Sequence, residues 1–188
     1  MAPKGVSVSG RSYSAASDVM SSSDVSRVLS RIAHEIVEHN RGCTGLVILG
    51  LQTGGVWIAE ELCRRLSDVA TFPSLLGSLD ISFYRDDHAI RPFVRSSFTN
   101  VPATLEDKTV LLVDDVLFTG RTVRAALDAI LDFGRPLSIQ LAVMVDRGHR
   151  ELPIRPDYVG KNLPTSRSEI VEVTREGVRI LKEVGNGP

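Results

Sequence analysis

A chain of 188 residues has about the length of one domain and can bury a sizeable hydrophobic core. Its formal net charge of −1 excludes a protein that binds nucleic acid through overall positive charge, so a nucleic-acid surface would have to be a local patch. No stretch reaches the roughly 18 apolar residues of a membrane span, and the N-terminus lacks the apolar segment of a secretion signal. The two cysteines offer no disulfide framework and have no metal-binding partners at suitable spacing. These features predict a cytoplasmic protein with no membrane segment.

The N-terminal segment, residues 1–22, is rich in Ser, Gly and Ala and shows no periodicity. This composition predicts a flexible leader, and the domain is then expected to span residues 23–184. Ser23 fits the cap of a helix that runs to Asn40, because apolar residues recur at near-helical spacing within this segment.

Two segments share the pattern of an apolar strand, a turn of small residues and a helix. Residues 45–51 form a short apolar run, and helical spacing over 56–66 follows the turn Gln52-Thr53-Gly54-Gly55. Residues 110–113 form a second apolar run that ends at two acids, and a helical pattern over 122–133 follows them. The carboxyl ends of such strands are where doubly wound sheets bind ligands.

Further strands are expected at 75–84 and 139–145, and residues 170–173 and 178–181 are expected to form a final pair. Residues 88–106 lack periodicity and contain Arg91 and Arg95, which predicts a flexible lid loop that closes on an anionic substrate. Strands that alternate with helices predict an α/β fold with a mainly parallel central sheet flanked by helices. The irregular C-terminal third is expected to form a hood over it.

The central feature of the sequence is Asp114-Asp115 followed by Thr119-Gly120-Arg121-Thr122. Adjacent carboxylates can accept hydrogen bonds from the two hydroxyls of a ribose, and a small-residue turn before a helix can bind phosphate. Together they suit a sugar phosphate. The acids could instead cap a helix or form an ion pair, or they could belong to a phospho-acceptor receiver domain. A receiver needs no anion site after its acids, so the turn argues against that alternative.

The same stretch resembles the phosphoribosyl-pyrophosphate motif of type I phosphoribosyltransferases, in which a hydrophobic strand, two acids, a hydrophobic pair, Thr-Gly and Thr follow at fixed spacing. More narrowly, residues 23–175 are similar to the PyrR family of pyrimidine-operon attenuators and uracil phosphoribosyltransferases. The similar segments in chain order are Arg31-Ile32-Ala33-His34-Glu35, Leu79-Asp80-Ile81, Tyr84-Arg85-Asp86-Asp87, Asp146-Arg147-Gly148-His149-Arg150-Glu151-Leu152-Pro153, Val159-Gly160-Lys161-Asn162 and Pro164-Thr165-Ser166.

This resemblance implies the type I phosphoribosyltransferase fold and a reaction in which uracil displaces pyrophosphate from phosphoribosyl pyrophosphate (PRPP) to give uridine monophosphate (UMP). Asp114 and Asp115 would bind the ribose hydroxyls and stabilise positive charge at the anomeric carbon. The implied cofactor is Mg²⁺, carried mainly by PRPP and water, so no metal site made of protein residues is expected. The other residues expected to contact substrate are Thr53, Gly54, Arg91, Arg95, Val116, Leu117, Phe118, Thr119, Gly120, Arg121, Thr122, Arg147 and Val171.

Each group of these residues has an implied part of the substrate. Residues 118–122 would hold the 5′-phosphate, and Thr53 and Gly54 would form the pyrophosphate loop. Arg147 would lie near the pyrimidine or the pyrophosphate. Main-chain groups of the hood near Val171 would bind the base.

One position departs from the family pattern. Family members commonly have Thr-Arg-Gly in the pyrophosphate loop, whereas this chain has Thr53-Gly54-Gly55. The missing guanidinium removes a bidentate pyrophosphate contact. On charge alone, the substitution Gly54→Arg is therefore expected to tighten PRPP binding.

The resemblance also implies that uridine nucleotides, UMP or UTP, promote binding to an RNA leader hairpin and thereby regulate transcription by attenuation. The residues that match the RNA-facing surface are Arg27, Ser30, Arg31, His149, Arg150, Arg155 and Lys161. From the residues alone, the exposed side of the first helix fits an ordinary solvated face, and residues 146–167 fit a hood held by ion pairs.

Three functional hypotheses follow. The first is a uracil phosphoribosyltransferase that also binds RNA, and the second is a UMP-sensing RNA-binding regulator with little or no catalysis. The third is a phosphoribosyltransferase for another base that has no RNA partner. The first predicts a homo-oligomer, a dimer or higher, because pairing two chains would enlarge the basic patch.

Overall fold

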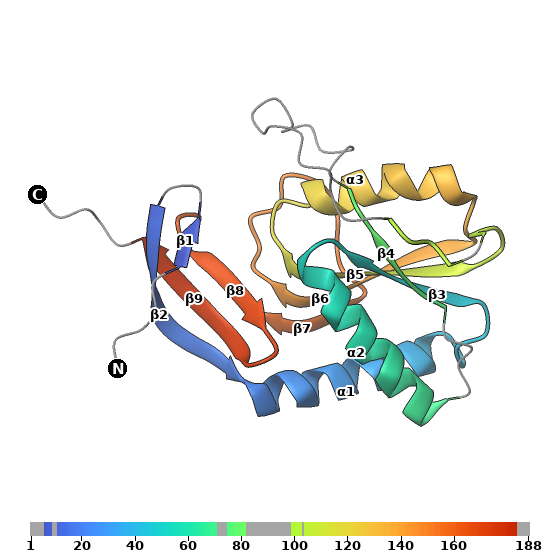
Figure 1. Cartoon of the computed structure of the whole chain (residues 1–188), viewed down its shortest axis with the longest axis horizontal. Coiled ribbons are helices and arrows are strands. Elements are labelled where there is room, and N and C mark those ends of the chain that lie inside the picture. Colours follow the sequence, from blue (N-terminus) through green and yellow to red (C-terminus); the bar gives the residue numbers. More distant parts are fainter. Residues whose placement is uncertain (1–5, 9–10, 71–74, 82–98, 103, 184–188) are drawn as a thin grey trace, which may run out of the picture.

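The computed structural model describes residues 6–8, 11–70, 75–81, 99–102 and 104–183. Its centre is a parallel sheet with the strand order β4-β3-β5-β6-β7. Figure 1 shows this sheet between two layers of helices, with α1 and α2 on one face and α3 on the other. The sheet strands are β3 (Leu46–Leu51), β4 (Leu76–Leu79), β5 (Thr109–Leu117), β6 (Ser138–Asp146) and β7 (Tyr158–Asn162), and the helices are α1 (Ser22–His39), α2 (Gly54–Val69) and α3 (Arg121–Ile130), which the 3₁₀ helix η3 (Leu131–Phe133) extends. The predicted α/β fold is confirmed.

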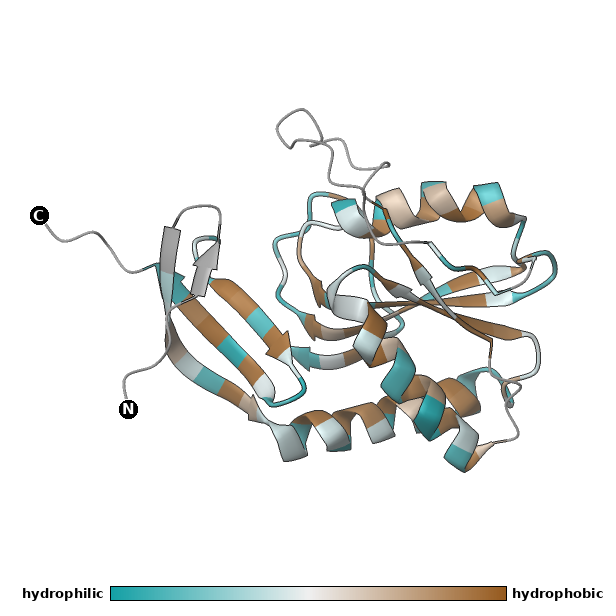
Figure 2. Ribbon diagram, viewed as in Figure 1, coloured by the Kyte–Doolittle hydropathy of each residue, from teal (hydrophilic) through white to brown (hydrophobic). Residues whose placement is uncertain are grey.

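Two hydrophobic clusters fill the space on either side of the central sheet. One joins the sheet to α1 and α2, and the other joins it to α3. Every residue of β3 is buried, as expected for a central parallel strand covered on both faces. Figure 2 shows the hydrophobic residues gathered in these strands. The helices therefore hold the sheet from both sides and leave its carboxyl edge for the turns.

A second, antiparallel sheet forms the hood. Its order is β1-β2-β9-β8, and it comprises β1 (Val6–Val8), β2 (Arg11–Ser21), β8 (Ile170–Thr174) and β9 (Gly177–Glu183). Figure 1 places this sheet beside the central domain, with α1 leading away from the end of β2. The predicted pair of C-terminal strands is thus confirmed, and the hood also contains the N-terminal segment.

The N-terminal segment differs from the expected leader over residues 11–21. These residues form β2, which pairs with β9 from Tyr13 opposite Glu183 to Ser21 opposite Gly177. The partner strand lies more than 150 residues away in the sequence, so local composition carried no signal of the pairing. Residues 1–5 and 9–10 lie outside the described residues.

The first helix begins one residue before the expected cap. Ser21, instead of Ser23, is the N-cap, and it forms a capping box with Asp24. The Ser21 hydroxyl accepts the Asp24 N–H, and the Asp24 carboxylate accepts the Ser21 N–H at 2.9 Å. The Ser21 hydroxyl also donates to the Asp24 carboxylate at 2.6 Å, and this bond, the Ser21 N–H and Arg27 lower the pKa of Asp24 to about 2.

Two other strands also have boundaries that differ from those predicted from the sequence. Residues 158–162, expected to be irregular, form the edge strand β7, which pairs parallel with β6. The acids were expected to follow the end of the strand. They lie within β5 instead, because the strand continues to Leu117. Of the extended segment predicted at 75–84, residues 75–81 are described, and Leu76–Leu79 among them form β4. Most of the predicted lid lies outside the described residues.

Both cysteines are buried, and burial raises the pKa of each thiol. They act as small apolar residues of the core, as predicted. In the described part of the chain, no helix is long and apolar enough to cross a membrane.

Candidate functional site

The acid pair lies at the carboxyl end of the central strand of the sheet. Asp114 is 6% exposed, and Asp115 is half-buried. The Asp115 N–H donates to Asp114 Oδ1 at 2.9 Å, and the Val116 N–H donates to Asp115 Oδ1 at 2.7 Å. The backbone of the strand end thus orients both carboxylates.

The β3–α2 turn, residues 52–55, packs directly against this acid pair. A Cβ atom on Gly54 would lie 2.1 Å from Asp115 Oδ2, and one on Gly55 would lie 2.0 Å from the Val113 carbonyl oxygen. A Cβ on Gly50 would likewise lie 2.6 Å from Val56 Cα. The three glycines let the start of α2 approach β3 and β5 more closely than any side chain would allow. The peptide between Gln52 and Thr53 in this turn is cis.

This packing changes what we expect of Gly54→Arg. Sequence reasoning considered the backbone geometry and the missing charge of this glycine, but its hydrogen also faces the Asp115 carboxylate directly. Any side chain at position 54 must displace that carboxylate, which accepts the Val116 N–H. We therefore no longer expect the added guanidinium to tighten PRPP binding.

The β5–α3 turn, residues 118–122, follows the acids on the other side of the site. Gly120 has φ of 93°, a left-handed conformation that glycine adopts without strain. Three successive carbonyls, that of Leu117 at the end of β5 and the first two of the turn, accept hydrogen bonds from one segment, residues 147–152. Leu117 O accepts the Arg147 N–H at 3.1 Å, and Thr119 O accepts the Glu151 N–H at 3.0 Å. Phe118 O accepts the Arg150 guanidinium at 2.8 Å.

Both turns present a helix N-terminus without a protein cap. The N-cap residues of α2 and α3 make no side-chain cap bond, although the Arg121 N–H at the start of α3 donates to Thr119 Oγ1 at 3.4 Å. Neither helix has an acid in its first turn, so far as the described residues show. In contrast, α1 carries a complete capping box and Asp24 in its first turn. Free N–H groups and the positive end of the helix dipole make each uncapped terminus suited to an anion. Two helix N-termini suited to an anion therefore flank the acid pair.

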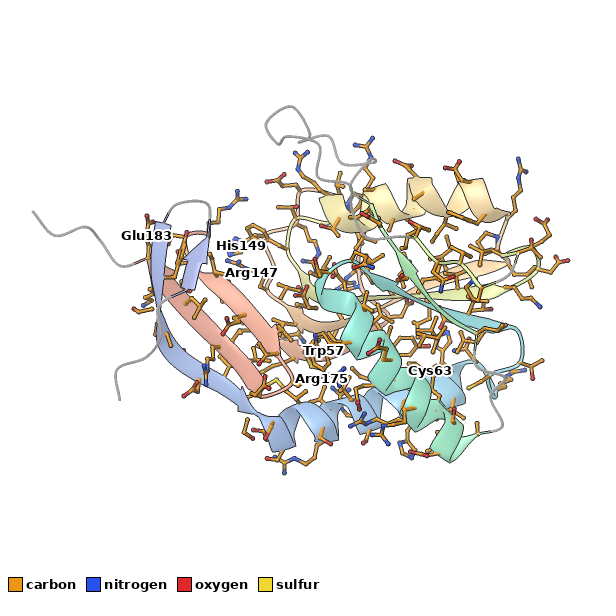
Figure 3. All side chains as sticks on the ribbon, viewed as in Figure 1. Trp57, Cys63, Arg147, His149, Arg175 and Glu183 are labelled. Carbon is orange, nitrogen blue, oxygen red and sulfur yellow. The ribbon has the colours of Figure 1, made fainter. Side chains whose placement is uncertain are left out.

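Phe118 connects the β5–α3 turn to the hood through two basic residues. The guanidinium carbon of Arg147 lies 4.2 Å from the Phe118 ring centroid, and the His149 ring meets the same ring edge to face at 5.7 Å. Arg147 donates to Thr165 Oγ1, Ser166 O and Glu169 O at 2.7–3.0 Å. Figure 3 shows Arg147 and His149 between the hood and the central domain. Burial of this guanidinium lowers the pKa of Arg147.

The hood contacts the site from two directions. Val171 is buried in the cluster formed by the sheet, α1 and α2, and its strand β8 contacts β5. At the β8–β9 turn, Arg175 lies 5.2 Å from the Trp57 ring centroid and pairs with Glu60 and Glu61, all on α2 (Figure 3). Sequence reasoning missed this contact between the β8–β9 turn and α2, because Arg175 lies more than 110 residues from its partners on α2 and neither segment forms a local motif.

The residues expected to bind RNA fall into two places. Arg27, Ser30 and Arg31 lie on α1, and Lys161 is an exposed residue of β7, which contacts α1. Arg31 joins these elements, since its guanidinium donates to the Val159 and Gly160 carbonyls at 2.8 and 3.0 Å. The other group, His149, Arg150 and Arg155, belongs to the segment between β6 and β7.

The degree of exposure separates these candidates. The Arg27 side chain is 77% exposed and pairs with Asp24. His149 and Arg150 are half-buried, and His149 Nε2 lies 2.6 Å from Thr165 O. Arg155 is exposed. Arg91 and Arg95, the expected lid residues, lie outside the described residues.

The described residues contain no cluster of three or more His, Cys, Asp or Glu side chains that could hold a metal ion. The acid pair could still contribute one or two carboxylate oxygens to a cation that a substrate also binds. Mg²⁺ is commonly held in this way, by few protein carboxylates together with phosphates and water.

Comparison with known proteins gives a consistent result. The phosphoribosyl transferase domain family matches residues 17–178. The bifunctional protein PyrR of Deinococcus radiodurans is 56% identical over 158 residues, which cover 82% of this chain and 85% of that protein. The protein of the same name from Brevibacillus brevis is 52% identical over 165 residues, 87% of this chain and 92% of its own.

Among solved structures, the hypoxanthine phosphoribosyltransferase of Trypanosoma cruzi has a TM-score of 0.71 at 21% identity and covers 90% of this chain and 98% of its own. A second hypoxanthine phosphoribosyltransferase, from Staphylococcus aureus, has a TM-score of 0.64 at 18% identity, over 81% and 80% of the two chains. These likenesses concern the fold alone.

Proposed function

Because the chain belongs to the PyrR family of phosphoribosyltransferases, we propose that it transfers the phosphoribosyl group of PRPP to uracil and regulates pyrimidine genes by binding RNA. The transfer breaks the bond between the anomeric carbon and pyrophosphate and forms a bond from that carbon to a ring nitrogen of uracil. The products are UMP and pyrophosphate, and the nitrogen loses its proton.

The observation that carries this proposal is the convergence of two uncapped helix N-termini on one pair of acids. PRPP has an anion at each end and a ribose between them. The β5–α3 turn offers its N–H groups to the 5′-phosphate, and the β3–α2 turn offers its own to the pyrophosphate. Asp114 and Asp115 lie between the turns, where the ribose hydroxyls require acceptors.

The acids also have an electrostatic role. As the pyrophosphate departs, positive charge develops on the ribose ring, and two fixed carboxylates stabilise that charge. The Val116 N–H holds Asp115 in place before the substrate arrives, so little reorganisation is needed. Mg²⁺ bound to the pyrophosphate oxygens would neutralise the charge of the leaving group.

The base is expected on the hood side of the acids. The Arg147 guanidinium lies over the Phe118 ring, between the β5–α3 turn and the segment before β8, and its hydrogen bond to Thr165 holds it there. Main-chain groups near Val171 would then select uracil by hydrogen bonds. Arg91 and Arg95 would close over the phosphates from the lid.

The decisive experiment measures whether the protein converts uracil and PRPP to UMP. Purified protein is incubated with PRPP, Mg²⁺ and uracil, and UMP is measured by chromatography, with Asp115→Asn as a control of lowered activity. Hypoxanthine, guanine and cytosine are run in parallel. Formation of UMP from uracil alone supports the proposal, whereas preference for another base would replace uracil as the substrate.

RNA binding is the second activity of the proposal. Arg27 and Lys161 are exposed basic residues on the adjacent elements α1 and β7 and offer charges to a phosphate backbone. We expect Arg27→Gln and Lys161→Gln to weaken the binding of a leader hairpin and to lower its salt dependence, while turnover is kept. A gel shift with and without UMP measures this, and the exposed Arg135→Gln is the control. Equal binding by all variants would contradict the proposed surface.

Arg31 is a less selective test than sequence reasoning suggested. Its guanidinium bridges α1 to the Val159 and Gly160 carbonyls, so Arg31→Gln removes a structural contact as well as a charge. The variant Arg31→Lys keeps the positive charge but not the guanidinium that bonds both carbonyls. Any RNA affinity that it loses is therefore due to the structural contact.

A regulator with little catalysis is the second candidate function, and Gly54 favours it. The turn that would hold pyrophosphate lacks the guanidinium common in the family, which weakens its hold on the leaving group. Protein that binds UMP and RNA but shows no turnover would establish this alternative. In either case we place the protein in the cytoplasm as a homo-oligomer.

A further inference from the structure

Arg150 is the most extensively bonded side chain near the site. Its Nη1 donates to Phe118 O at 2.8 Å and approaches Gly148 O at 3.3 Å, and its Nε donates to Ile154 O at 2.9 Å. Its Nη2 pairs with the Asp146 carboxylate. All three nitrogens of the guanidinium are therefore bonded within the protein, and the side chain is 23% exposed.

These bonds determine the direction of the peptides in the β5–α3 turn. In a trans peptide the C=O and the following N–H point to opposite sides. The carbonyls of Leu117, Phe118 and Thr119 all point toward residues 147–152. The N–H groups of residues 118, 119 and 120 must therefore point away from that segment, toward the side where a phosphate can be bound.

The middle one of these three carbonyls depends on a side chain. Backbone N–H groups of Arg147, Glu151 and Leu152 hold Leu117 O and Thr119 O. Phe118 O is held by the Arg150 guanidinium instead. The remaining Arg150 bonds, to Asp146 and Ile154, fix the guanidinium from the opposite side.

We propose that Arg150 is a positioning residue for substrate, which orients the β5–α3 turn so that its N–H groups meet the 5′-phosphate. This role rests on the proposed function. Loss of the guanidinium frees the peptide between Phe118 and Thr119 to rotate, and one phosphate donor is then lost.

Substitutions at one position distinguish positioning from charge. Arg150→Gln removes the guanidinium, and Arg150→Lys keeps the positive charge but not the planar fork that bonds several carbonyls at once. Positioning predicts that both variants lose affinity for ribose 5-phosphate, which carries the 5′-phosphate without pyrophosphate. A contact between charge and RNA phosphate predicts instead that Arg150→Lys keeps RNA affinity and that neither variant affects ribose 5-phosphate.

The test is isothermal titration of the full-length protein with ribose 5-phosphate and, separately, with Mg²⁺-pyrophosphate. We expect the dissociation constant for ribose 5-phosphate to rise about tenfold in Arg150→Gln and Arg150→Lys, the equivalent of one lost hydrogen bond to a charged group. The dissociation constant for pyrophosphate stays the same, which a general loss of folding would not produce. Arg64→Gln, an exposed arginine on α2, is the matched control and should resemble wild type. A folded Arg150→Gln that binds ribose 5-phosphate like wild type would overturn the proposal.

A measurement on the wild-type protein covers the case in which the Arg150 variants unfold. Ribose 5-phosphate should slow amide hydrogen exchange at residues 118–120, and the absence of this protection would overturn the peptide orientation. The outcome is independent of catalysis. Wild type that binds ribose 5-phosphate with this protection but does not turn over uracil contradicts the proposed function and leaves the role of Arg150 intact.

Discussion

The two turns that flank the acid pair are built in different ways. Hydrogen bonds hold the β5–α3 turn, because residues 147–152 bond to three of its carbonyls in succession. Close packing holds the β3–α2 turn, because Gly54 and Gly55 lie against Asp115 and the backbone of Val113 with no room for a Cβ atom. Both end at an uncapped helix N-terminus.

This difference has a consequence for how each turn tolerates change. A turn held by hydrogen bonds can lose one bond and keep its general shape, since neighbouring bonds remain. A turn held by close packing against backbone cannot accept even one added carbon without a shift of the chain. The β3–α2 turn is therefore expected to be the more sensitive to small substitutions and the β5–α3 turn to the loss of polar groups.

The largest effect is expected at Gly55. A Cβ atom there would meet the Val113 carbonyl oxygen at 2.0 Å, and backbone on both sides prevents an easy adjustment. We expect Gly55→Ala to destabilise the protein by about 3 kcal/mol, at the upper end of the cost of overpacking. Gly42→Ala is the control, because Gly42 has open space around it and φ of 113°, so it reports only the cost of the left-handed conformation. Urea unfolding measures both, and equal losses would contradict packing as the cause.

The acid between the turns should affect turnover more than stability. Asp115→Asn keeps the size of the side chain and an oxygen acceptor but removes the charge that stabilises the developing cation. We expect kcat to fall by about tenfold to a hundredfold, which corresponds to roughly 1.4 to 2.8 kcal/mol. The measurement is steady-state UMP formation, and Glu172→Gln on β8 in the hood is the charge-removal control.

The general architecture could be predicted from the sequence because its signals are local. The apolar run before Asp114 and the Thr-Gly turn after it each lie within a few residues, so strand, anion site and helix followed from periodicity and turn chemistry. The strand β2 could not be predicted, because residues 11–21 have no apolar alternation and become a strand only by pairing with β9.

The candidate site shows the same limit. The sequence identified the acids and the glycines as candidate site residues but did not predict that they are in contact. Gly54 and Asp115 are 61 positions apart in the sequence and meet only through the packing of α2 on the sheet. Arg150 was singled out as a cation for RNA. Its bonds to main-chain carbonyls could not be inferred from spacing, because carbonyl orientation is a property of the folded chain.

Gly54 provides a direct test of the packed turn. In Gly54→Ala the added carbon must move the Asp115 carboxylate, which breaks the bond to the Val116 N–H while the fold is kept. We expect kcat/KM for PRPP to fall about tenfold, the usual cost of misplacing one fixed charge-bearing group. Gly54→Arg should fall as well, and a variant that binds PRPP more tightly than wild type would show that the missing charge outweighs the packing.

The smallest effect concerns α1, the helix whose N-terminus the protein caps for itself. Ser21→Ala removes the hydroxyl of the capping box and should lower the free energy of unfolding by about 1 kcal/mol, a typical cost of a lost cap. PRPP kinetics should not change, because Ser21 and Asp24 cap this terminus, whereas the proposed phosphate sites lie at the termini of α2 and α3.

The side-chain hydrogen bond from Ser21 is the largest cause that lowers the pKa of Asp24 to about 2 from its usual 3.8. A lowered pKa contributes stability above the unfolded value, so the difference between wild type and variant should be full above pH 4 and shrink as the pH falls toward 2. Urea unfolding at several pH values measures it, and a difference that grows on acidification would contradict the role of the Asp24 carboxylate in the cap.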